Sequence, residues 1–266
     1  MKPDLRLAVN FILGGLGAGC AVAAYLLSLV GGISEGDLIL PYAASGIIMA
    51  IGLVCVWVKI GPQLRPPRIL LRQSTSWMAR EAYAASIFYA ALIADWAARS
   101  PILEALTAAA AGAFLLSQGK IVQSSKSRPH WRAPEMPSLI AITGLAQGVG
   151  LICVFALIAP PIFRAEPLAA IAGIVLAMMG AYRWQEYVGN AENQTNDMKR
   201  ITMVSHACLH GLPFALYLAT FIPWSGSKWV MAGGGLVAIA GAALWQNILV
   251  TRLGRSHAFV GTPIGH

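Results

Sequence analysis

An arginine and a glutamate stand together where a long apolar stretch of the sequence begins. Arg80 and Glu81 close the segment LLRQSTSWMAREAY (70–83), and the residues that follow are mostly apolar as far as Ala94. Ionisable side chains at membrane depth are costly and tend to mark functional pathways. Burial favours the neutral form of a carboxyl group, which suits Glu81 to accept and release protons. A quinone needs such a group, because its two-electron reduction takes up two protons. A structural interpretation stays open, in which Glu81 is an interfacial residue paired with Arg80 or Arg72.

The residues before the pair predict a helix start. Ser74, Thr75 and Ser76 are plausible N-cap residues. A helix that begins at Trp77 places Trp77 and Glu81 on one face, four residues apart. A capping box on Ser76 is excluded, because its partner position is Ala79.

Three further polar residues stand within apolar stretches. Asn10 can donate a hydrogen bond to a quinone carbonyl, or it can make a polar contact between helices. His206 and His210, in MVSHACLHGLPF, share one helix face. They fit an interhelical contact, a proton path or a second quinone contact. A bis-histidine haem normally draws ligands from two helices, and the other histidines lie in loops or the tail, so we expect no haem.

The cysteines argue against a metal centre in this chain. Cys20, Cys55, Cys153 and Cys208 stand singly inside apolar stretches. Zinc and iron–sulfur sites need clustered thiolates. We therefore expect small buried side chains and no bound metal.

The amino-acid composition indicates that these residues lie in a membrane protein. Hydrophobic residues make up 57% of the 266 residues and charged residues only 11%, whereas soluble domains are about 25% charged. We expect an all-α integral membrane protein that forms a single membrane domain over residues 1–266. The net charge of +8 comes from short loops between apolar spans, so we expect contact with the lipid bilayer and no nucleic-acid partner. The first apolar stretch is too long for a signal peptide, and we expect the N-terminus to be retained.

Eight apolar spans are predicted, because about 20 apolar residues cross the hydrocarbon as a helix. A tight turn at Arg99-Ser100-Pro101 joins the third span to the fourth, and Gly14 and the glycines of 17–19 predict close helix contacts. The expected spans are about 6–30, 40–59, 82–99, 101–119, 138–160, 166–184, 201–222 and 229–250.

The distribution of Lys and Arg predicts the orientation. Of the 19 basic residues, all but Arg99, Arg164 and Lys228 fall on the side that holds both termini. Basic loops favour the cytoplasm. We therefore expect both termini and the long basic loops to be cytoplasmic, in a multi-pass protein of a bacterial inner membrane.

The block SWMAREA (76–82) resembles the S-W-x-x-R-E block of the membrane-anchor subunits of DMSO-reductase-type molybdenum enzymes. That superfamily includes the polysulfide reductase and formate-dependent nitrite reductase anchors. The resemblance extends to the eight spans, to the arginine-rich loop before the block and to the tail HAFVGTPIGH (257–266). Given the predicted orientation, it is nearest to anchors with cytoplasmic catalytic subunits, of the sulfite dehydrogenase or phenylacetyl-CoA:acceptor oxidoreductase type.

The resemblance implies a fold and a quinone site. The fold would be two four-helix bundles, about 6–119 and 138–250, with a tail at 251–266. A non-covalently bound menaquinone or ubiquinone would exchange protons with Glu81, and Arg80 would position the Glu81 side chain. Asn10 and Trp77 would line the pocket. Lys59 is a further expected quinone contact, and it stands in K-I-G, where many members of the family have a His in H-L-G.

The resemblance also implies two partners. An iron–sulfur subunit would dock on Arg65, Arg68 and Arg72, and it would bind a catalytic subunit with a molybdenum or tungsten pterin. Two other functions stay open: a small transporter or permease, and a haem-b-type anchor.

Overall fold

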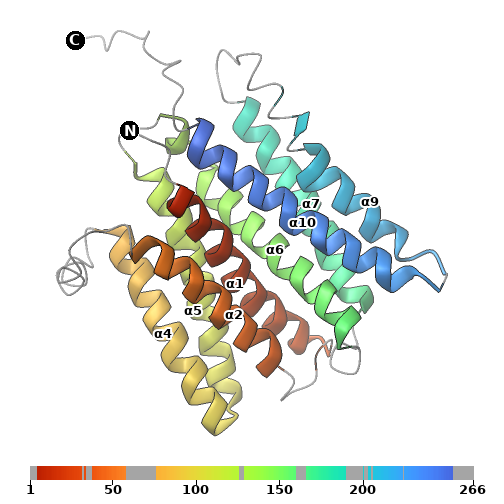
Figure 1. The fold of residues 1–266 in the computed structure, drawn as a ribbon, viewed down its shortest axis with the longest axis horizontal. Helices are drawn as coiled ribbons and strands as arrows, with labels where there is room; N and C mark the ends of the chain where they lie inside the picture. The colour runs from red at the N-terminus through yellow and green to blue at the C-terminus, as the bar shows by residue number, and fades with distance from the viewer. Residues whose placement is uncertain are drawn as a thin grey trace.

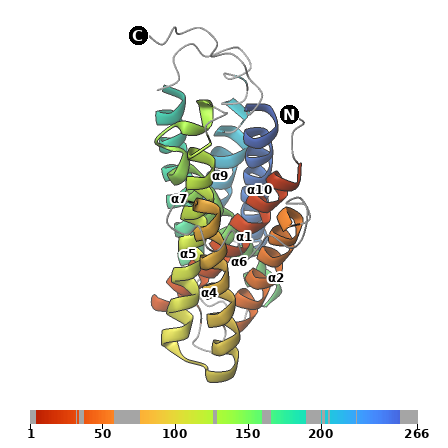
Figure 2. The same ribbon diagram turned by 90° about the vertical axis from the view of Figure 1, so that its left-hand side faces the viewer.

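The computed structural model is built from helices that run along one common direction (Figures 1 and 2). It describes residues 5–31, 33, 38–57, 76–125, 129–159, 166–189, 200, 203–204, 206–223 and 225–253. Within them the α-helices are α1 (Leu5–Leu29), α2 (Ile39–Trp57), α4 (Trp77–Ala98), α5 (Pro101–Gln123), α6 (Met136–Ile158), α7 (Glu166–Gly189), α9 (Leu212–Ala219) and α10 (Ser227–Ile248). A 3₁₀ turn covers Pro129–Arg132, and π-helical turns cover His206–Gly211 and Leu249–Leu253.

The prediction of an all-helical membrane protein is confirmed. In the described part of the chain, 6 helices are long and apolar enough to cross a membrane: α1, α2, α5, α6, α7 and α10. Helix α4 is 22 residues long but less apolar, since it carries Arg80, Glu81 and Asp95. The π turn and α9 together form a shorter helical stretch, from His206 to Ala219.

The helix ends differ from the predicted spans by about five residues in two places, and α5 ends at Gln123 rather than near 119. Helix α4 begins at Trp77 rather than near residue 82, and α7 continues to Gly189 rather than ending near 184. Hydropathy marks only the apolar part of a helix, whereas backbone hydrogen bonds continue it into the interface. As a result, Arg80 and Glu81 lie inside α4.

The turn between α4 and α5 is tight, as predicted. Arg99 adopts the left-handed conformation (φ 48°, ψ 58°) that ends α4. The backbone N–H of Ser100 then donates to Oδ1 of Asp95 at 3.0 Å. Pro101 begins α5, where its missing N–H removes no helix hydrogen bond.

Helices α1 and α6 lie at the centre of the molecule, and consecutive helices alternate in direction (Figure 1). Helix α1 packs on α2, α5, α6 and α10, while α6 packs on α1, α5, α7 and α10. Helix α4 packs chiefly on α5, and α9 packs on α7 and α10. The two central helices therefore connect the N-terminal helices to the C-terminal ones.

Small residues bring the two central helices into backbone contact. A methyl group at Gly19 would overlap the backbone of Gly144, and one at Gly148 would overlap the backbone of Gly19. On another face of α1, a methyl group at Gly17 would lie 2.6 Å from the carbonyl oxygen of Ser45 in α2. The predicted close contacts of the α1 glycines are thus confirmed, as is usual where membrane helices pack through small residues.

Candidate functional site

Glu81 lies in the second turn of α4 and faces into the protein. Ser76 is the N-cap residue, with extended backbone (φ −124°, ψ 120°) and no side-chain capping bond. The first helical hydrogen bond of α4 is a backbone bond, in which the N–H of Arg80 donates to the carbonyl oxygen of Ser76 at 3.2 Å. Atom Oε1 of Glu81 is shielded from solvent. The sequence therefore places a carboxyl group inside the membrane domain, one turn from the helix start.

Two amide side chains from other helices surround this carboxyl group. The side chains of Asn10 in α1 and Gln118 in α5 both interact with the Glu81 carboxyl as hydrogen-bonding neighbours. Asn10 is 3% exposed and Gln118 is 0% exposed. We call Asn10, Glu81 and Gln118 the amide–carboxylate cluster. Polar residues that are distant in sequence, from three helices, thus meet at one point.

A glycine makes room for the cluster. A methyl group at Gly14 of α1 would lie 2.5 Å from Nε2 of Gln118 and 3.0 Å from Cε1 of Phe114. The Gln118 amide fills this space and donates from Nε2 to the backbone oxygen of Asn10 at 3.3 Å. Gln118 is consequently held against α1.

The cluster has spare hydrogen-bond acceptors. Within the residues that the structure describes, Oδ1 of Asn10, Oε1 of Glu81 and Oε1 of Gln118 are buried without a hydrogen-bond partner. Buried polar atoms are normally paired, because an unpaired one costs about 1–3 kcal/mol. A ligand with O–H groups would supply donors to these oxygens, and protonation of Glu81 would create one such donor within the cluster. The arrangement therefore suits a hydroxyl-bearing ligand next to a carboxyl group that can exchange protons.

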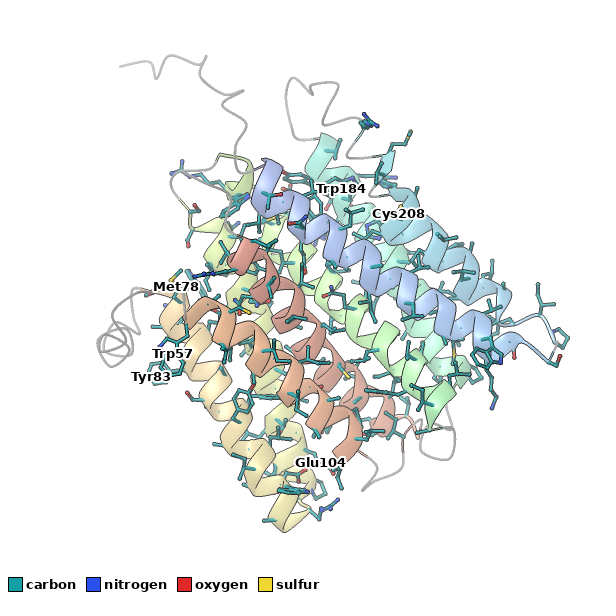
Figure 3. The ribbon with its side chains drawn as sticks, viewed as in Figure 1. Trp57, Met78, Tyr83, Glu104, Trp184 and Cys208 are labelled. Atoms are coloured by element: carbon teal, nitrogen blue, oxygen red, sulfur yellow. The ribbon has the colours of Figure 1, made fainter. Side chains whose placement is uncertain are left out.

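Arg80 and Trp77 lie beside the cluster, in the first turn of α4. The Arg80 guanidinium stacks over the Trp77 ring, 4.2 Å from its centroid. Arg80 is exposed and Trp77 is half-buried. Figure 3 places Trp57, Met78 and Tyr83 at this same end of the molecule, and Glu104 at the opposite end.

Four of the predicted site residues lie outside the described residues. These are the proposed quinone contact Lys59 and the proposed docking residues Arg65, Arg68 and Arg72.

The predicted histidine pair is brought together in the C-terminal half. The rings of His206 and His210 lie 5.9 Å apart, edge to face. Both belong to the π-helical turn before α9, and His210 is buried against Gly180 of α7. Nε2 of His210 has no hydrogen-bond partner among the described residues. The two rings thus lie together as predicted, and Nε2 of His210 makes no interhelical hydrogen bond within the described part of the chain.

Sequence reasoning missed a set of buried amides. Gln118 is one, and Gln147 of α6 and Gln246 of α10 are two more, both at most 1% exposed. The last two meet at Gly15, where a methyl group would lie 3.2 Å from Oε1 of Gln147 and 3.4 Å from Nε2 of Gln246. Isolated amides within apolar spans are the signal that identifies such residues.

The described residues contain no group of three His, Cys, Asp or Glu side chains that could hold a metal ion. All four cysteines are free, and Cys20 and Cys153 are buried. No protein-family model and no curated protein matches this chain.

Proposed function

We propose that this chain is the quinone-reactive membrane-anchor subunit of a multi-subunit oxidoreductase. The observation that carries the proposal is the amide–carboxylate cluster, in which the Glu81 carboxyl of α4 lies between Asn10 of α1 and Gln118 of α5. The helices would cross a bacterial inner membrane eight times as two four-helix bundles. The alternating direction of consecutive helices supports that topology.

The cluster supports quinol chemistry at the level of single atoms. A quinol carries two O–H donors, and the unpaired oxygens of Asn10, Glu81 and Gln118 are acceptors. Oxidation releases two electrons and two protons, and Glu81 would take up a proton as the O–H bond breaks. In the reverse direction a protonated Glu81 would donate to the reduced quinone oxygen. Asn10 and Gln118 would hold the ring, because an amide presents both a donor and an acceptor.

The electrons would pass to or from a separate subunit. The described residues supply no metal-binding group of their own, and the cluster lies near one end of α4. An iron–sulfur subunit docked on that end would be the electron partner, and a molybdenum or tungsten pterin subunit would bind to it. The predicted docking residues are Arg65, Arg68 and Arg72. The bias of basic residues to this side supports a cytoplasmic position.

Glu81→Gln tests the proton role. The variant keeps the side-chain size and removes the exchangeable carboxyl, so turnover with a soluble quinol analogue should fall by about 100-fold or more. Glu186→Gln is the matched control, because Glu186 pairs with Arg183 at 2.7 Å on a partly exposed face of α7. Both variants should assemble with the partners. Wild-type turnover in Glu81→Gln would exclude Glu81 as the proton-exchanging group.

Purification through a tag on this chain separates the competing functions. Mild detergent extraction, mass spectrometry and metal analysis should recover two larger subunits with iron and molybdenum or tungsten. Recovery of the chain alone and metal-free would favour the transporter. A Soret band would favour the haem-b anchor, although His206 and His210 come from one helical turn.

A further inference from the structure

An apolar groove opens between α2 and α4 toward the surrounding lipid. It encloses about 390 Å³. Helix α2 packs chiefly on α1, and α4 packs chiefly on α5, so the two helices leave this space between them. Ile47 and Ile93 stand at its outer edge, 63% and 67% exposed. The other lining residues are Ile39, Tyr42, Ala43, Gly46, Ala50, Tyr89, Leu92, Asp95 and Trp96.

The polar groups of the groove already have hydrogen bonds within the protein. The hydroxyl of Tyr42 donates to the backbone oxygen of Glu104 at 2.9 Å. The hydroxyl of Tyr89 donates to the backbone oxygen of Gly46 at 2.8 Å. Asp95 accepts from the Ser100 N–H at the end of α4. Apart from the indole of Trp96 the remaining surface is hydrocarbon, and it fits a flexible hydrocarbon chain.

The groove shares a helix face with Glu81. At 100° per residue, Leu92 and Trp96 lie within about 60° of Glu81 around α4. Tyr89 stands eight residues beyond Glu81, about 12 Å along the helix axis. The α4 side of the groove therefore begins about 12 Å from Glu81, and the buried side chain of Phe88 lies on the face between them.

The α2 wall of the groove ends close to the α1 backbone at Asn10. Helix α2 contributes residues from Ile39 to Ala50. Two residues after Ala50, a methyl group at Gly52 would lie 3.1 Å from the backbone nitrogen of Gly14 and 3.5 Å from the backbone oxygen of Asn10. Ala50 thus stands at the end of the groove that is nearest to the cluster.

We propose that the polyprenyl tail of the quinone bound at Glu81 lies in the groove between α2 and α4. This inference rests on the proposed function. The α2 wall from Ile39 to Ala50 is about 16 Å long, which accommodates several isoprene units. The open side of the groove lets the quinone enter sideways from the bilayer, so that the headgroup reaches Asn10 and Gln118 while the tail keeps contact with apolar side chains.

Two ligands with one headgroup test the inference. The purified protein, with any subunits that co-purify, is placed in lipid nanodiscs. It is titrated with a naphthoquinone that carries four isoprene units, and with 2,3-dimethylnaphthoquinone, which has no tail. Tryptophan fluorescence quenching reports binding. Affinities are expressed per mole fraction in the bilayer, so that partitioning into lipid cancels. The wild-type protein should prefer the tailed quinone by about tenfold, because the tail gains packing contacts in the groove.

Ala50→Phe and Ala43→Phe fill the groove at two separate positions. Each should reduce the tail preference to about one- to twofold and leave the affinity for the tailless quinone unchanged. Ala109→Phe is the matched control, since Ala109 is an exposed residue of α5 outside the groove, and it should keep the full preference. Two positions are used so that a folding defect in one variant does not decide the outcome.

Glu81→Gln distinguishes the headgroup site from the tail site. It should lower the affinity for both quinones by the same factor and keep the preference for the tailed quinone. A preference retained in Ala50→Phe and in Ala43→Phe would overturn the tail site, leave the headgroup site standing and assign the groove to ordinary lipid chains. Unchanged affinity for both quinones in Glu81→Gln would overturn the proposed function and the tail site with it.

Discussion

The side-chain amide of Gln118 donates to the backbone oxygen of Asn10 at 3.3 Å, which links α5 to α1 beside the Glu81 carboxyl. The amide oxygen of Gln118 is buried and has no hydrogen-bond partner among the described residues. A residue with a spare buried acceptor beside a carboxyl group is better arranged to contact a ligand than to stabilise the fold.

Gln118→Leu should therefore weaken quinone binding more than it weakens the protein. Loss of one ligand hydrogen bond corresponds to roughly a tenfold rise in KM for a quinol analogue. The free energy of unfolding should change by less than about 1 kcal/mol, because an unpaired buried oxygen is removed together with the bond. Steady-state kinetics and thermal unfolding in detergent measure the two effects.

Gln123→Leu is the control on the same helix. Gln123 also donates to a backbone oxygen at 3.3 Å, that of Ala133, but it lies outside the cluster. Its loss should leave KM unchanged. Equal KM effects in the two variants would argue for a general disturbance of α5.

Gly14→Ala should reproduce the Gln118 phenotype. The new methyl group would lie 2.5 Å from Nε2 of Gln118, so the amide must move away from Asn10. We expect a KM increase of about fivefold to tenfold. The double variant with Gln118→Leu should add nothing further, because both changes remove one interaction.

Gly112→Ala serves as the comparison for Gly14→Ala. A methyl group there meets only Cγ2 of Val22, at 3.9 Å, which is an ordinary contact. Fully additive effects of Gly14→Ala and Gln118→Leu would show that Gly14 acts through something other than the amide.

Gly148→Ala should destabilise the protein by about 1–3 kcal/mol, because its methyl group would overlap the backbone of Gly19 where α1 crosses α6. Gly233→Ala should instead raise the free energy of unfolding by about 0.5–1 kcal/mol, because its methyl group meets nothing within 4 Å and alanine favours the helix. Denaturant unfolding in detergent micelles measures both. A neutral Gly148→Ala would mean that the two helices can separate freely.

His210→Leu should be tolerated. The buried Nε2 of His210 has no partner among the described residues, so an apolar side chain of similar size should change the free energy of unfolding by less than about 1 kcal/mol. Thermal unfolding and the visible absorption spectrum report the result. A Soret band in the parent protein that disappears in the variant would identify His210 as a haem ligand.

The fold follows from the sequence to the extent that hydropathy governs it. Apolar runs located the helices, and the glycines of α1 predicted the close crossings. The helix ends were less predictable at Trp77 and Gly189, where the backbone continues the helix through residues that are not apolar.

The candidate site was predictable only in part. Glu81 and Asn10 stand out as polar residues in apolar spans, but no pattern pairs residue 10 with residue 81. Their meeting depends on how α1, α4 and α5 pack. Gln118 was missed because one amide near a helix end carries no periodic signal, and only the missing side chain of Gly14 shows where it fits.

The crossing of α1 and α6 also has a consequence for biosynthesis. Gly144 is translated about 125 residues after Gly19, its contact in α1. At roughly 5–20 residues per second, α1 spends about 6–25 s in the membrane before its contact in α6 exists. During that interval α2 can cover the Gly17 face, and α4 and α5 can bring Glu81 and Gln118 to Asn10, while the Gly19 face stays exposed to lipid or to the insertion machinery. Completion of the α1 surroundings is thus a late event, which follows the synthesis of α6.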